Sequence, residues 1–294
     1  MVKTMKKGKL RRVELFDVIT WIILGLLCLC IILPLYYVVV LSFTSYSQYI
    51  KSAGFILFPA PISLDGYKQF ITDPAVPKAF LVTTYLTVFG TVLNLIATVL
   101  IAYPLSRKEL PHRKFFVLVT FFPMLFSGGL IPTFYVIRQT GIMNTTWAMI
   151  LPYLISVYDM MIVRSFFQSL DDAYIEAARI DGASEIGILC RVVLPLSAPV
   201  LATVTLMYGV GHWNCFFPAL YYVRDPDLQP LQIVLRGILD EAQNTLEEVD
   251  PSVTAASQAM KQAAVVLTAL PVIIVYPFLQ KYFTQGMMLG GVKG

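Results

Sequence analysis

The sequence predicts an all-α polytopic membrane protein with six transmembrane helices. Of its 294 residues, 57% are hydrophobic and 14% are charged, whereas soluble proteins carry about 45–50% apolar and about 25% charged residues. The mean hydropathy of +0.72 is an average over the whole chain, so apolar residues are not confined to one buried core. A net charge of +4 argues against a polybasic nucleic-acid binder.

Each predicted span is a run with few or no charges, close to the roughly 20 apolar residues that one helical crossing needs. The runs lie at 18–41, 79–106, 115–137, 143–168, 192–223 and 262–283. The fourth is the least apolar, because it is rich in Thr, Asn and Tyr and contains two charged residues. The first has 24 uncharged residues, too many for a signal-peptide core of about 7–15, and is expected to remain as an anchor.

Basic residues near the membrane ends predict that both termini lie in the cytoplasm. In this orientation the cytoplasmic segments hold 14 Lys and Arg residues and the opposite segments hold 7, as the positive-inside rule requires. The expected organisation is a cytoplasmic amino-terminal segment (1–17), a transmembrane domain (18–283) and a cytoplasmic tail (284–294). Within the domain, 169–195 is a cytoplasmic loop and 224–261 is an acidic external loop.

Enzymatic chemistry has almost no candidate residues. The two histidines, His112 and His212, exclude an HExxH zinc site and leave almost nothing for a Ser-His-Asp arrangement. Four cysteines without CxxC spacing are interpreted as buried small hydrophobic side chains, so no metal site is predicted. The only Gly-Lys pair, Gly8-Lys9, lacks the upstream glycine of a phosphate-binding loop. The chain is therefore expected neither to be an enzyme nor to hydrolyse ATP by itself.

The cytoplasmic loop between the fourth and fifth spans is the most informative segment. Asp171 and Asp172 suit a helix start, and Gly182 suits a helix stop, since glycine adopts left-handed backbone angles without steric cost. Ser184 can begin a second short helix, and Pro195 introduces the fifth span. The sequence therefore predicts two short helices in an elbow. An ordinary amphipathic loop without a partner is an equally good interpretation of these features alone.

The same residues resemble a known family. The loop resembles the EAA loop of type I ABC-importer permeases. The matching pattern is Glu176-Ala177-Ala178, then three residues, Gly182, nine further residues and Val192-x-Leu194-Pro195. The flanking residues Asp181-Gly182-Ala183 resemble the sugar-importer branch. The tail from Gln280 to Gly294 is similar to the carboxyl terminus of the smaller permease of maltose-type carbohydrate importers. The resemblance covers nearly the whole chain.

The resemblance implies a permease that an ATPase drives. Glu176 would pair with a basic residue of the ATPase, Ala177 and Ala178 would pack closely and Gly182 would form the turn, with Asp181, Ala183, Leu194 and Pro195 completing this coupling site. The tail residues that would touch the ATPase are Gly290, Gly291, Lys293 and Gly294, although a terminus without a partner is an alternative.

The resemblance also implies partners and a location. They are a second homologous permease, an ATPase dimer that binds ATP and magnesium, and an extracellular solute-binding protein that delivers an oligosaccharide. The external loop at 224–261 would reach the binding protein. The location would be the bacterial cytoplasmic membrane.

The substrate path is less well defined by the sequence. Sugar sites combine aromatic faces with hydrogen-bonding groups, so the candidates are Tyr208, His212, Trp213, Asn214 and Asp159. Trp213 could instead belong to an interfacial aromatic belt. The segment Arg224 to Gln232 looks like a subgroup associated with oligosaccharides, including fragments that contain uronic acids. A self-sufficient ion-coupled carrier or channel is the alternative function, with Asp159 as its proton site.

Overall fold

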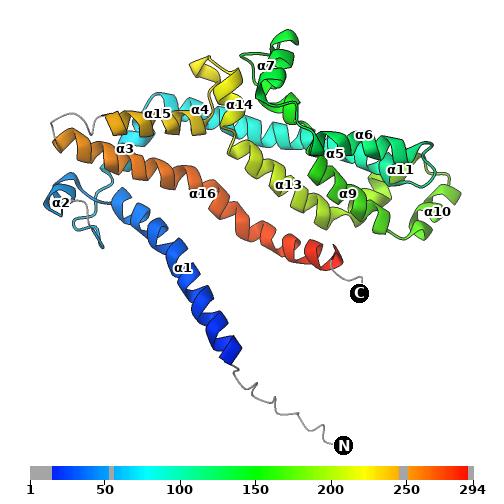
Figure 1. Cartoon of the computed structure of the whole chain (residues 1–294), viewed down its shortest axis with the longest axis horizontal. Coiled ribbons are helices and arrows are strands. Elements are labelled where there is room, and N and C mark those ends of the chain that lie inside the picture. The colour runs from blue at the N-terminus through cyan, green and yellow to red at the C-terminus, as the bar shows by residue number, and fades with distance from the viewer. Residues whose placement is uncertain (1–14, 53–55, 245–250, 291–294) are drawn as a thin grey trace, which may run out of the picture. The chain divides into compact units, whose positions relative to one another are not determined.

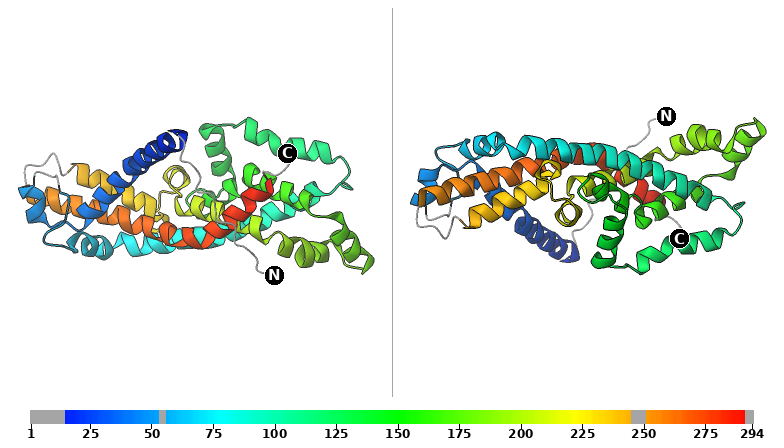
Figure 2. Two further views of the ribbon diagram at one scale, coloured as in Figure 1. Left: turned by 90° about the horizontal axis from the view of Figure 1, so that it is seen from below. Right: turned by 90° about the horizontal axis from the view of Figure 1, so that it is seen from above.

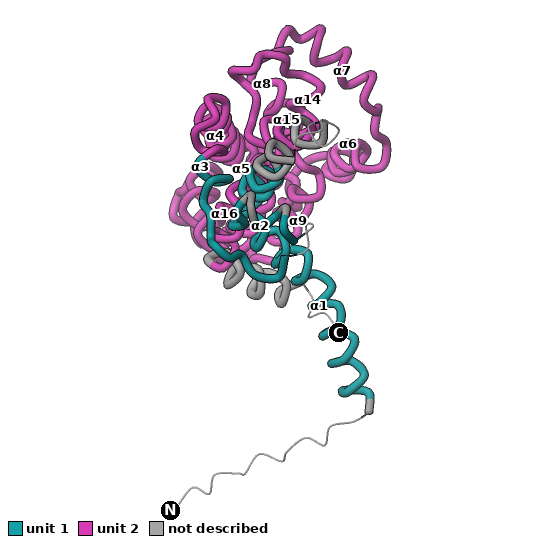
Figure 3. Tube along the Cα trace, turned by 90° about the vertical axis from the view of Figure 1, so that its left-hand side faces the viewer, with its two compact units in different colours: residues 1–68, 245–266 teal, residues 69–244, 267–294 magenta. Residues whose placement is uncertain are grey.

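The computed structural model describes residues 15–52, 56–244 and 251–290. Every regular element in these ranges is a helix, and a single bridge between Thr44 and Ile62 is the β-type pairing found there. The chain falls into two compact units, residues 1–68 with 245–266 and residues 69–244 with 267–294 (Figure 3). The all-α expectation is therefore confirmed for the described residues.

The first unit is built around α1 (Leu15–Ser42), with α2 (Tyr46–Lys51) and the beginnings of α3 (Asp65–Thr72) and α16 (Pro251–Gly290). The end of α1 is fixed by two hydrogen bonds, from Tyr36 OH to Leu57 O (2.6 Å) and between Ser42 Oγ and Tyr67 OH (2.8 Å). No residue in its most apolar stretch is buried. This uncovered surface needs hydrocarbon or another protein beside it.

The second unit is organised by one long helical segment, α4 (Ala75–Tyr85), the π-helical η1 (Leu86–Gly90) and α5 (Thr91–Ser106). Figure 1 shows α9 (Val157–Ser169) and α13 (Ala198–Trp213) beside α5. Apolar residues from these helices form a common core that includes Ala102, Val163, Phe167 and Val204.

Shorter helices complete the second unit, and they can be followed in the two views of Figure 2. They are α6 (Arg113–Leu125), α7 (Leu130–Gln139), α8 (Trp147–Ile150), η2 (Leu151–Tyr153), α10 (Asp172–Ile180), α11 (Glu185–Ile188), η3 (Leu189–Val193), α12 (Leu194–Leu196), α14 (Phe217–Tyr222), η4 (Pro226–Leu228) and α15 (Leu231–Asn244).

The number of spans depends on how bent helices are counted. In the described residues, three helices are long and apolar enough to cross a membrane, and there are up to six spans if each bent pair is one crossing. The pairs bend by 114° between α6 and α7, by 49° before α9 and by 84° before α13. Gly128 and Gly129 stand at the first bend, residues 154–156 at the second and Ser197 at the third. The six-span expectation thus holds with bent pairs.

Two sequence-based details differ from the structure. The fifth span was predicted as one helix over 192–223. In the structure its main helix, α13, runs only from Ala198 to Trp213, because the helix is broken at Ser197 and again after Trp213. The cysteines were expected to be buried, yet Cys28, Cys30 and Cys190 are exposed and Cys215 alone is buried. Hydropathy makes no distinction between the apolar surface of a protein core and one that faces lipid.

Gly90 permits α13 to approach the η1 segment closely. A Cβ atom on Gly90 would lie 2.6 Å from the His212 ring. His212 is itself buried, with Nε2 3.4 Å from Asn94 Oδ1. The ring therefore has little freedom to move away from an added methyl group.

We expect Gly90→Ala to lower the stability of the second unit by about 1–3 kcal/mol, the usual cost of overpacking. Thermal unfolding of the full chain in detergent measures this. Gly211→Ala on α13 is the matched control, because no atom of the described residues lies within 4 Å of its Cβ position. A Gly90→Ala midpoint equal to that of Gly211→Ala would contradict the close approach.

Candidate functional site

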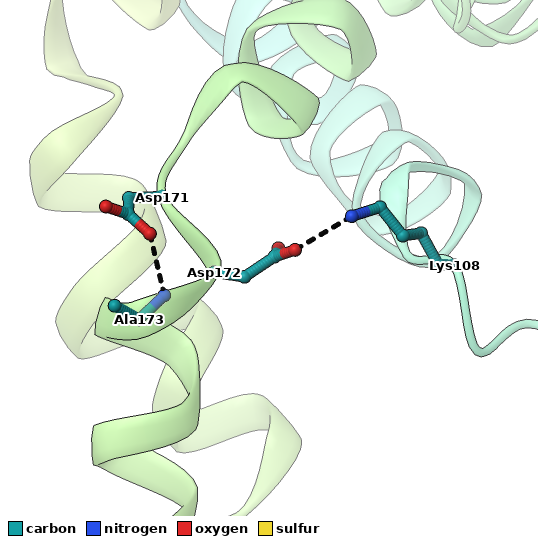
Figure 4. Close-up of polar contacts among 4 residues, drawn as sticks. All are labelled: Lys108, Asp171, Asp172 and Ala173. Carbon is teal, nitrogen blue, oxygen red and sulfur yellow. Dashed lines mark hydrogen bonds and ion pairs between the residues drawn. The ribbon is translucent and has the colours of Figure 1, made fainter.

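The cytoplasmic loop predicted at 169–195 forms an elbow of two short helices, as the sequence indicated. Asp171 accepts a hydrogen bond from Ala173 N (3.0 Å) and so caps α10, while Asp172 forms an ion pair with Lys108 Nζ (2.9 Å), as Figure 4 shows. The hydrogen bond and charge of Lys108 lower the pKa of Asp172. The start of α10 is therefore linked to the loop that follows α5.

Gly182 ends α10 through a Schellman motif. Its φ is +80°, its N–H donates to Arg179 O (3.1 Å), and Ala183 N donates to Ala178 O (3.0 Å). Ser184 then caps α11 by accepting from Gly187 N at 3.2 Å. The helix stop predicted at Gly182 and the restart at Ser184 are both confirmed.

Three side chains, which we call the elbow latch, hold the second helix of the elbow. Glu185 accepts from Arg179 Nη2 (2.7 Å) and from Tyr103 OH (2.9 Å), so it joins α10 and α11 to the end of α5. The guanidinium of Arg107 lies 4.9 Å from the centre of the Tyr103 ring. Arg179 and Glu185 were not among the predicted coupling residues, and Tyr103 lies 82 positions before Glu185. Local sequence patterns carry no signal for such a contact.

We expect Glu185→Ala to loosen the elbow while the bundle stays folded. Removing the acceptor leaves Arg179 and Tyr103 without their shared partner, and we expect amide exchange in α10 and α11 to accelerate about fivefold, the upper range for a surface pair. Hydrogen exchange of the full chain measures this. Asp240→Ala, which breaks the exposed Arg236–Asp240 pair on α15, is the control. Equal exchange in both variants would show that the latch holds nothing.

The elbow has one face in the core and one uncovered face. Ile175 is buried, and Ile188 and Val193 belong to the same core cluster as α5, α9 and α13. On the other side Ile180 is 86% and Ile186 is 75% exposed. Large exposed apolar side chains beside a buried core face are candidates for a surface that binds a partner.

The predicted coupling residues are distributed over this elbow. Glu176, Ala177, Asp181 and Gly182 are exposed, and Ala178 and Ala183 are half-buried. Two further residues lie apart, on α12 after the second helix, where Leu194 is half-buried and Pro195 is exposed. The exposed apolar residues Tyr174, Ile180 and Ile186 were missed. For Ile180 the sequence contained a signal. It lies five residues after Ile175, so on a helix it points away from the side that Ile175 turns to the core.

A groove of about 450 Å³ adjoins the latch. It lies between the loop after α5 and the elbow and is lined by residues that include Tyr103, Arg107, Arg179, Glu185, Ile186 and Leu189. Two nitrogens of Arg107 are buried without a hydrogen-bond partner in the described structure. The groove extends the uncovered surface of the elbow towards α5.

The predicted substrate-path residues are mostly engaged inside the protein. Tyr208 OH contacts Thr98 Oγ1 (2.7 Å) and accepts from Ser156 N (3.1 Å). Trp213 is 7% exposed and donates to Thr268 O (3.0 Å), so it does not belong to an interfacial belt.

The other three candidates differ from one another. His212 contacts Asn94, as described above, whereas Asn214 is exposed and donates to Val210 O (2.9 Å). Asp159 is 6% exposed, and its Oδ1 has no hydrogen-bond partner in the described structure. Arg164, on the same helix, donates to Leu105 O instead of pairing with Asp159.

The start of the predicted external loop is anchored to the second unit. Asn144 Oδ1 accepts from Arg224 N (2.9 Å) and Asp225 N (2.8 Å), and Lys78 pairs with Asp227. The acidic stretch around 247–250 and the tail residues Gly291, Lys293 and Gly294 lie outside the described residues. Gly290 is the last described residue of α16.

Comparison with known proteins decides between an importer and a self-sufficient carrier. Residues 5–289 match the model of the family described as binding-protein-dependent transport system inner membrane component. The chain belongs to this family. It is therefore a membrane transport component of an ABC importer, and ATP hydrolysis takes place in a separate subunit. This membership favours an importer over a self-sufficient carrier.

Two curated relatives match this permease over nearly their whole length. Protein LplC of Bacillus subtilis (strain 168) is 40% identical over 295 residues, which cover 100% of this chain and 99% of that protein. The polygalacturonan/rhamnogalacturonan transport system permease protein YtcP of the same organism is 38% identical and covers 96% of this chain and 99% of its own.

Solved structures give the same architecture. A chain of a bacterial ABC transporter involved in the import of the acidic polysaccharide alginate is similar with a TM-score of 0.84 and 29% identity, over 95% of this permease and 100% of that chain. A chain from a bacterial alginate ABC transporter in complex with an alginate pentasaccharide-bound periplasmic protein has a TM-score of 0.56 at 15% identity, over 90% of this permease and 95% of that chain. This second likeness supports the fold alone.

Proposed function

We propose that this permease imports oligosaccharides, including fragments that contain uronic acids, and that its elbow is the ATPase dock. The observation that carries the proposal is the two-sided elbow. One side is continuous with the core of α5, α9 and α13, and Glu176, Ile180 and Ile186 are exposed outside that core. A displacement imposed on the exposed side must move the helices that the buried side contacts.

Each residue of the elbow has a defined part in the proposed dock. Glu176 would accept a charge-assisted hydrogen bond from a basic ATPase residue. Ala177 and Ala178 would let the ATPase backbone approach closely, and the turn at Asp181, Gly182 and Ala183 would enter a cleft. Leu194 and Pro195 would connect the elbow to α13. The tail residues Gly290, Gly291, Lys293 and Gly294 are retained as a second ATPase contact.

The partners follow from the same proposal. A second homologous permease would line the path, an ATPase dimer would bind ATP and magnesium, and an extracellular binding protein would deliver the sugar at the loop 224–261. The exposed length of α1 supports a lipid or permease neighbour. The orientation with both termini in the cytoplasm rests on the 14 and 7 basic residues of the two sides.

The proposed substrate class rests on relatives whose names include polygalacturonan/rhamnogalacturonan and arabinooligosaccharides, and on an alginate importer. Of the proposed path residues, Asp159 and Asn214 have the polar groups most available to a sugar. Asp159 Oδ1 has no hydrogen-bond partner in the described structure, and Asn214 is exposed. Tyr208, His212 and Trp213 would support the wall of the path without touching the sugar, through the buried contacts described above.

Reconstitution tests the proposal. The permease, its partner permease and its ATPase are placed in liposomes with the binding protein outside, and uptake of a labelled galacturonic-acid oligosaccharide is measured. We expect uptake only with ATP at the ATPase side and with both permeases present. A neutral arabinose oligosaccharide of the same length is the control for acid preference. Gradient-driven uptake by this chain alone would establish the carrier instead.

A further inference from the structure

A second groove, distinct from the elbow, lies between α6 and α9. Its volume is about 480 Å³, and its lining consists of Arg113, Lys114, Val117, Leu118, Phe121, Met161 and Arg164. Three of these residues are cationic and four are apolar, so the groove combines two chemically different ends.

The cationic end forms no ion pair with an acid among the described residues, although Arg113 also lines a neighbouring groove with Glu109 and Asp172. Arg113 Nε and Arg164 Nε both donate to the same carbonyl, Leu105 O, at 3.0 Å. With the Gln168 amide turned so that its oxygen faces them, both guanidinium groups also donate to that oxygen. Neutral oxygens satisfy hydrogen bonds but leave two like charges side by side. Among the described residues, neither arginine nor Lys114 forms an ion pair with a carboxylate.

The apolar end follows one face of α6. Val117, Leu118 and Phe121 lie one and two turns beyond the cationic pair at 113 and 114, so helical spacing aligns them in a single stripe. Leu118 is 66% exposed, and Met161 of α9 forms the opposite wall. The charges therefore stand where the apolar stripe begins, as expected at a membrane boundary.

We infer that this groove binds an anionic phospholipid, with its phosphate at Arg113, Lys114 and Arg164 and one acyl chain along Val117, Leu118 and Phe121. A phospholipid is the occupant that supplies both an anion and a hydrocarbon chain in this order. Basic pockets between membrane helices bind such headgroups on the cytoplasmic side. This lipid site rests on the proposed function in one respect, because the proposed orientation assigns this end of α6 and α9 to the cytoplasmic leaflet.

Native mass spectrometry of the assembled importer tests the site, with phosphatidylglycerol and phosphatidylcholine as probes. The key variant is Lys114→Gln, because Lys114 is exposed and makes no hydrogen bond within the described structure, so the fold does not depend on it. One surface charge near anionic lipid is worth about 1 kcal/mol, which predicts about fivefold less bound phosphatidylglycerol. Arg113→Gln added to Lys114→Gln should lower it further, and Arg113→Lys should retain it.

Lys108→Gln is the matched control, because it removes a neighbouring exposed charge that is already paired with Asp172. We expect it to leave lipid binding unchanged. Millimolar inorganic phosphate should fail to displace the lipid. Equal retention of the two lipids, an equal loss in Lys108→Gln and Lys114→Gln, or displacement by phosphate would each overturn the lipid site. Because the readout needs neither ATP nor sugar, its failure is separate from failure of the proposed transport function.

Discussion

Replacing Glu176 by alanine is expected to release the ATPase from this permease. Glu176 is exposed on α10, on the side of the elbow that the bundle does not cover. If its carboxylate is paired inside the dock, truncation leaves the ATPase cation without its partner and costs about 2–5 kcal/mol. That cost corresponds to an association weaker by about thirtyfold or more. Co-purification of the ATPase with the two permeases, together with sugar-stimulated ATP hydrolysis, measures the effect.

The control for Glu176→Ala is Asp240→Ala, a carboxylate on α15 that the proposed orientation places on the other side of the membrane. We expect this variant to keep its ATPase in co-purification. Both variants should still insert and pair with the second permease, and the sugar affinity of the binding protein should not change. Normal ATPase retention in Glu176→Ala would remove Glu176 from the dock.

Gly182→Val is expected to uncouple ATP hydrolysis from sugar delivery. The φ of +80° at Gly182 belongs to the left-handed region, which costs an L-residue roughly 1–2 kcal/mol and is least tolerated by β-branched side chains. No atom of the part of the chain that the structure describes lies within 4 Å of the Cβ position. The variant therefore acts through backbone strain and through the space that the ATPase would occupy. The ratio of ATP hydrolysed to sugar imported in proteoliposomes should rise several-fold.

Gly182→Asn separates the two causes. Asparagine tolerates left-handed angles at a helix end, so it relieves the strain while still placing a side chain in the open space. We expect normal protection of α10 from hydrogen exchange in Gly182→Asn and a partial loss of coupling. Full coupling in Gly182→Val would contradict the assignment of this turn to the dock.

The sequence predicted the elbow well because its determinants are local. The cap at Asp171, the stop at Gly182 and the restart at Ser184 each depend on a few neighbouring residues, and each was found where expected. The contact between Tyr103 and Glu185 was not predictable in this way, because the fold alone brings together residues 82 positions apart.

The bends between helices and the burial of individual side chains were also not predictable from the sequence. An uncharged run from 115 to 137 indicates a span, but hydropathy contains no term for the 114° angle between α6 and α7. Likewise, Trp213 and His212 have the composition of a sugar site, yet tertiary packing uses them for contacts with Thr268 and Asn94. Residue type alone does not distinguish a cavity wall from a buried helix contact.

The central claim is that the exposed side of the elbow touches the ATPase, and photo-crosslinking tests it most directly. Ile180→benzoylphenylalanine places the probe on the elbow residue that is 86% exposed, and Ile22→benzoylphenylalanine on α1 is the control. On irradiation of the assembled importer, we predict a product joining this permease to the ATPase from position 180 and none from position 22. An elbow probe that crosslinks only lipid or the partner permease would contradict the account.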